Sequence, residues 1–123
     1  MEQSVKSIVN NLNIPELDWI ISYQSRVGPL KWIGPSTEEI ISKNSKLGKK
    51  IVLVPIAFVS EHSETLVELD IEYKELADKN GCVEYIRVPA LGTNVDFINS
   101  LSSLVINKDE NKYLKKFLFK HQI

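Results

Sequence analysis

One short segment places a histidine and three carboxylates at regular spacing. His62 lies two residues before Glu64, and Glu68 and Glu72 continue from Glu64 in steps of four. In a helix this spacing puts the carboxylates on one face. Carboxylate oxygens suit hard divalent cations, whereas imidazole nitrogen suits iron, zinc, copper or nickel. The pattern therefore predicts a divalent-metal site whose candidate ligands are His62, Glu64, Glu68 and Glu72.

The same carboxylates also fit a second interpretation, the solvent-facing side of an amphipathic helix. Its apolar stripe would consist of Leu66, Leu69, Tyr73, Leu76 and Ala77. The opposite side would carry Glu61, Glu64, Glu68, Glu72 and Glu75. Like charges four residues apart cost about 0.2–0.5 kcal/mol per pair, and this cost favours a functional row. A lone histidine at a helix start, by contrast, is more often a surface residue.

The number of ligands indicates what kind of metal site this would be. His62 and Glu64 supply at most two ligands, fewer than the four of a closed structural zinc site. An open site with few protein ligands is what a metal that is passed onward requires. The sequence therefore favours metal transfer over a structural metal.

The elements that must position these side chains alternate between strand and helix. We expect a helix ending near Leu12, a strand at 19–23, a helix from the capping box 36–39 to Gly48, a strand at 51–54, a helix at about 60–79, a strand at 83–88, and a helix capped by Thr93 or Asn94. Three strand–helix units predict an α/β fold, a three-layer αβα arrangement with a parallel, Rossmann-like sheet. Segments 24–35 and 55–64 then follow the carboxyl ends of strands, where such sheets bind ligands.

Composition limits the classes of protein that remain. The 123 residues predict one domain, with 1–16 as the end of a preceding helix and a linker, and 107–123 as a polar tail. A net charge of -1 gives no basic field for nucleic acid. Cys82 is the only cysteine, so we expect no iron–sulfur cluster within this chain. With no signal peptide or membrane-length apolar run, we expect a cytoplasmic protein, whose lysine-rich and aromatic tail could also suit peripheral contact with an anionic membrane.

Three stretches of sequence resemble the C-terminal half of ferrochelatases. They are SYQSRVGP at 22–29, WIGPST at 32–37 and VPIAFVSEHSETLVELDIEY at 54–73. The resemblance covers about Leu17 to Val105, in order and with similar spacing. Ferrochelatases insert ferrous iron into protoporphyrin IX to form protohaem in haem biosynthesis. The resemblance implies a chelatase-type sheet and names protoporphyrin IX and Fe²⁺ as substrates.

The resemblance also implies roles for particular residues. Glu64 corresponds to the carboxylate that faces the family's catalytic histidine across the porphyrin, as iron ligand or proton acceptor. His62 corresponds to a neighbour that positions the site, and Glu68 and Glu72 to an acidic line for metal entry or proton exit. The porphyrin pocket would include Trp32, Phe58 and Arg26, where Arg26 either contacts a propionate or packs within its loop.

The family's N-terminal half, which carries the catalytic histidine and much of the porphyrin cleft, is missing from this sequence. We therefore expect a lyase of ferrochelatase type in which the chain works with that half or with a second copy of itself. Two other interpretations stay open: a small homodimeric chelatase, and a non-catalytic metal- or haem-binding module. Glu61, where many members have aspartate, and segment 91–97, which lacks the common asparagine and proline, depart from the family pattern.

Overall fold

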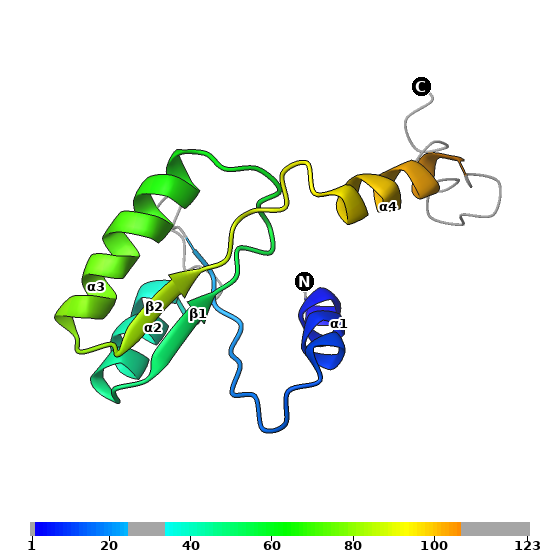
Figure 1. Cartoon of the computed structure of the whole chain (residues 1–123). Coiled ribbons are helices and arrows are strands. Elements are labelled where there is room, and N and C mark those ends of the chain that lie inside the picture. The colour runs from blue at the N-terminus through cyan, green and yellow to red at the C-terminus, as the bar shows by residue number, and fades with distance from the viewer. Residues whose placement is uncertain (1, 25–33, 107–123) are drawn as a thin grey trace. The chain divides into compact units, whose positions relative to one another are not determined.

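The computed structural model describes residues 2–24 and 34–106, and the chain divides into two compact units, Met1–Ala90 and Leu91–Ile123 (Figure 1). The first unit contains α1 (Glu2–Leu12), α2 (Thr37–Lys46), β1 (Lys50–Leu53), the π-helix η1 (Glu64–Glu72), α3 (Tyr73–Lys79) and β2 (Glu84–Arg87). The second contains α4 (Val95–Ile106). Within the described residues, no helix combines the length and the apolar composition needed to cross a bilayer.

The predicted parallel pairing of strands is confirmed, and the described residues form a sheet of two strands. β1 and β2 pair in parallel, from Lys50 opposite Glu84 to Leu53 opposite Arg87. Their connection runs through η1 and α3, as parallel strands require a crossover. Ile51 and Leu53 face the helices and pack against the core, whereas Val52 on the other face is 60% exposed. The described residues thus establish a mixed helix–strand unit with helices on one face of the sheet.

The strand expected at 19–23 is not formed. Tyr23 makes a single parallel bridge with Ser36, and Trp19 and Ile20 stay 41% and 50% exposed. A strand is stabilised by hydrogen bonds to a neighbouring strand and by side-chain packing on both faces. Among the described residues, neither is found for Trp19 and Ile20. The apolar, β-branched composition of this segment was therefore not sufficient to make a strand.

The predicted ends of α2 and the predicted cap of α4 agree closely with the structure because their signals are local. The Ser36 hydroxyl accepts a hydrogen bond from the Glu39 amide at 3.2 Å, which completes the N-cap of α2. Gly48 follows this helix with a φ of 66°, a conformation that favours glycine. At α4 the cap is Asn94, whose Oδ1 accepts from the amides of Asp96 and Phe97 at 3.0 and 3.2 Å.

The helix expected at about 60–79 begins later and is wider than an α-helix. Its first nine residues form η1, and the Tyr73 amide donates to the Glu68 carbonyl, five residues back. The wider turn changes which side chains face the sheet. Thr65 is fully buried, and Leu66, predicted on the buried stripe, is 48% exposed. The prediction for Leu66 is wrong because it assumed α-helical periodicity.

The core of the first unit lies between α2, the η1–α3 helix and the sheet. Its buried apolar residues are Ile41, Leu69, Tyr73 and Ala77, each 3% exposed or less. Tyr85 on β2 also donates its hydroxyl to the Leu69 carbonyl at 2.7 Å, so η1 is tied to the sheet by a hydrogen bond as well as by packing.

Leu69→Ala is expected to lower the free energy of unfolding by about 2–5 kcal/mol, because it leaves a cavity in this core. Leu66→Ala removes the same atoms from an exposed position of the same helix, and should cost roughly 0.5 kcal/mol or less. Urea unfolding of both variants measures the difference. Equal losses would show that η1 does not place these two leucines as described.

Candidate functional site

The candidate site begins in the loop that leaves the carboxyl end of β1 and enters η1. The His62 amide donates to the Thr65 hydroxyl at 2.9 Å, and that hydroxyl donates to the His62 carbonyl at 3.0 Å. Thr65 has no exposed surface. The reciprocal pair fixes the main chain at the start of η1, so His62 and Glu64 have a defined position relative to the helix.

The imidazole ring of His62 is held on two sides. Phe58 contacts it edge to face, with ring centroids 4.6 Å apart and planes at 80°. The Glu64 amide donates to Nδ1 at 3.2 Å. A neutral ring that accepts at Nδ1 carries its proton on Nε2. In this arrangement His62 presents an N–H outward, and binding a metal through Nε2 would require that hydrogen bond to break.

The three carboxylates after His62 follow one line along the helix. Thr65, Leu69 and Tyr73 are all buried and lie four residues apart. Each glutamate directly precedes one of them, so Glu64, Glu68 and Glu72 must lie along a common line beside the buried row. The expected row of carboxylates on one side of the helix is therefore present.

The three carboxylates have different surroundings. Glu64 and Glu72 are exposed, whereas Glu68 is half-buried and accepts a hydrogen bond from the Tyr73 hydroxyl at 2.9 Å. Burial, together with the Glu68 carboxylate, holds the pKa of Tyr73 well above its usual range. Tyr73, which had been expected only as part of the apolar stripe, therefore stays a proton donor to Glu68.

Glu61 does not join this row, although the sequence had placed it there. Its carboxylate accepts from Arg87 at 2.6 Å and from the Ala90 amide at 2.8 Å. The hydrogen bond from Arg87 is the main cause that lowers the pKa of Glu61 to about 2, and the nearby Thr65 hydroxyl and the Ala90 amide add to it. Glu61 is thus committed to an ion pair and not available to an incoming cation.

Of the three residues predicted for the porphyrin pocket, the structure describes only Phe58. Phe58 is half-buried against His62, whereas Arg26 and Trp32 lie outside the described residues. Within 2–24 and 34–106, no three or more His, Cys, Asp or Glu side chains converge on a point that could hold a metal ion. Three of the four predicted metal ligands lie on η1 and His62 lies in the loop before it, and their role as ligands stays a prediction.

The family is decided by comparison with known proteins. Residues 1–109 match the ferrochelatase family model. The chain belongs to the ferrochelatase family. It is 77% identical over 113 residues to the ferrochelatase of Pelagibacter ubique (strain HTCC1062), a match that covers 92% of this chain and 33% of that protein. The ferrochelatase of Rickettsia conorii is 57% identical over 106 residues, covering 86% of this chain and 31% of the relative.

The predicted resemblance is thus confirmed, and its extent is now defined. The chain spans about a third of the length of the curated ferrochelatases it matches, including that of Rickettsia felis at 58% identity. About two thirds of each of these relatives therefore has no counterpart in the sequence described here.

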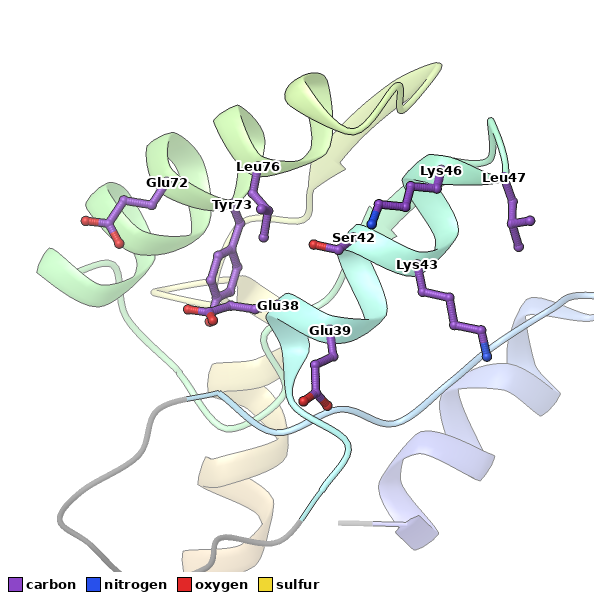
Figure 2. A pocket seen from close by; sticks show the side chains of 9 residues that line it. All are labelled: Glu38, Glu39, Ser42, Lys43, Lys46, Leu47, Glu72, Tyr73 and Leu76. Carbon is purple, nitrogen blue, oxygen red and sulfur yellow. The ribbon is translucent and has the colours of Figure 1, made fainter.

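A groove next to the acidic line is lined by residues of α2 and of the η1–α3 helix. It has a volume of about 870 Å³. Figure 2 shows its lining residues, with Tyr73 extending toward α2 and the Glu72 carboxylate directed away from Lys43 and Lys46. These lysines therefore do not neutralise the last carboxylate of the line in this member of the ferrochelatase family.

Two residues of the candidate site were not foreseen from the sequence. Thr65 fixes the turn at His62. Its position four residues before Leu69 could have indicated from the sequence that it lies in the buried row. Arg87 lies within a strand and is nearly buried, with 8% of its side chain exposed. The available signal for Arg87 was its place two residues after Tyr85, on the same face of the strand, since arginine is rarely buried unless paired.

Proposed function

We propose that this chain forms the metal side of a ferrochelatase, which inserts Fe²⁺ into protoporphyrin IX to give protohaem. The observation that carries the proposal is the anchored His62–Glu64 turn at the carboxyl end of a parallel strand, with further carboxylates continuing down one helix. The family membership and the 77% identity to a ferrochelatase over 92% of the chain support it.

The proposed chemistry follows from the charges of the two substrates. When Fe²⁺ enters the macrocycle, two pyrrole protons must leave. Glu64 is exposed and negatively charged, so it is suited to take a proton or to contact the arriving ion. Glu68 and Glu72 continue the negative charge away from that point and provide a path for a cation or a proton. His62 offers its Nε2 proton as a donor beside Glu64 and keeps the turn in place.

The porphyrin would lie against the turn that carries these groups. Phe58 supports the His62 ring and offers apolar surface, and we assign Trp32 and Arg26 to the same pocket on the family resemblance. The remaining two thirds of a complete ferrochelatase would supply the opposite wall of the cleft, together with the catalytic histidine. It would also add further strands beside β1 and β2 and the second helix layer of the proposed three-layer αβα fold.

A chimera tests this proposal. The matching 113 residues of the Pelagibacter ubique ferrochelatase are replaced by those of this chain. We expect the folded chimera to convert protoporphyrin IX and Fe²⁺ to protohaem at a rate comparable with that of the parent enzyme. A chimera that folds and binds porphyrin but does not insert iron would contradict the proposal, and the parent enzyme processed in parallel is the control.

A further inference from the structure

A nearly buried guanidinium group lies close behind the His62–Glu64 turn. Arg87, the last residue of β2, has 8% of its side chain exposed. It makes a two-pronged contact with Asp70 of η1, from Nε to Oδ1 at 2.6 Å and from Nη2 to Oδ2 at 2.5 Å. Its Nη1 donates to Glu61 Oε1 at 2.6 Å. Every nitrogen of the guanidinium therefore has a carboxylate partner.

These contacts join three separate parts of the first unit. Glu61 belongs to the loop after β1 and directly precedes His62. Asp70 lies on η1, six residues after Glu64. Glu61 Oε1 also accepts from the Ala90 amide at 2.8 Å, which adds the segment that follows β2. Because the guanidinium is planar and rigid, it fixes the loop relative to the helix in a way that a flexible ammonium group does not.

We propose that Arg87 is a positioning residue for the His62–Glu64 turn, acting through Glu61 and Asp70. The inference rests on the proposed function of that turn in metal insertion. Without the guanidinium, the Glu61 and Asp70 carboxylates lose their common partner, and only the His62–Thr65 hydrogen bonds hold the turn to the start of η1. The contact of the Glu64 amide with His62 Nδ1, 3.2 Å in the intact turn, is then weakened, and the proton of the ring is less strictly confined to Nε2.

Arg87→Lys tests the proposal because it keeps the charge and removes the planar fork. The first measurement is the ¹⁵N chemical shifts of the His62 ring in alkaline buffer, which report whether Nδ1 or Nε2 carries the proton. The second is Co²⁺ affinity by calorimetry. Both are made well below the unfolding midpoint of each variant. Lys74→Gln is the matched control, since it removes the exposed Lys74–Asp78 ion pair on α3.

We expect wild type and Lys74→Gln to keep the Nε2-protonated ring and the same Co²⁺ affinity. Arg87→Lys should show a mixture of both tautomers and bind Co²⁺ at least about tenfold more weakly, the usual effect of losing an outer-shell partner. An Arg87→Lys chain with wild-type ring shifts and affinity would overturn the proposal. If wild type itself binds no Co²⁺, the proposed function fails, whereas the ring shifts still decide the role of Arg87. Should Arg87→Lys not fold, Glu61→Gln takes its place, with unchanged ring shifts as the contradicting result.

Discussion

Glu64→Gln is expected to weaken Co²⁺ binding by about 100-fold or more, whereas His62→Ala should weaken it by about tenfold. The carboxamide introduced by Glu64→Gln has the size of the original carboxylate but lacks its charge and one strong acceptor. Glu64 is exposed at the head of the acidic line, so its carboxylate is free for a hard cation. The lone pair of His62 Nδ1, by contrast, already accepts from the Glu64 amide at 3.2 Å. Removing the ring should therefore disturb the turn without removing the main ligand.

Calorimetric titration of the two variants makes this comparison, and Glu75→Gln is the matched control. Glu75 lies on α3, is exposed and carries the same charge, but it is not one of the residues that precede the buried row. A general loss of negative charge would weaken binding equally in Glu64→Gln and Glu75→Gln. If His62→Ala alone reduced the affinity, the assignment of Glu64 as the main metal ligand would be wrong.

The sequence predicted those parts of the fold that depend on neighbouring residues. Ser36 caps α2, Gly48 ends it and Asn94 caps α4, because each signal acts over only a few residues. The row of Glu64, Glu68 and Glu72 was also predictable, since a spacing of four residues keeps side chains near one another in an α-helix and in the wider η1 alike.

The parts that could not be predicted depend on contacts far along the chain. Because η1 is a π-helix, Thr65 is buried in the row where Leu66 was expected. No periodic pattern in the sequence distinguishes this π-helix from an α-helix. Arg87 meets partners 17 and 26 residues away, so its role became visible only when β2, η1 and the loop were brought together. The strand expected at 19–23 was not formed because pairing and burial, not composition, decide whether such a segment joins a sheet.

The other prediction with a large expected effect is that the isolated chain does not catalyse metal insertion. Metal insertion acts on both faces of one porphyrin plane, and a closed cleft must grip and bend the macrocycle. The chain spans about a third of the length of its relatives, and its identified groups follow a single turn and helix. Docking to one surface would stabilise substrate and transition state about equally, which does not accelerate the reaction. We therefore expect the isolated chain to bind metal but not to make protohaem faster than the uncatalysed reaction.

Protohaem formation from protoporphyrin IX and Fe²⁺ distinguishes the metal side of a ferrochelatase from a complete small enzyme. It is measured with the chain alone, with the remaining N-terminal part of the Pelagibacter ubique ferrochelatase alone, and with both together. We expect turnover only in the mixture, and its loss when the chain carries Glu64→Gln. Turnover by the chain alone, rising with protein concentration as two copies associate, would contradict this expectation and show that this is a small homodimeric chelatase.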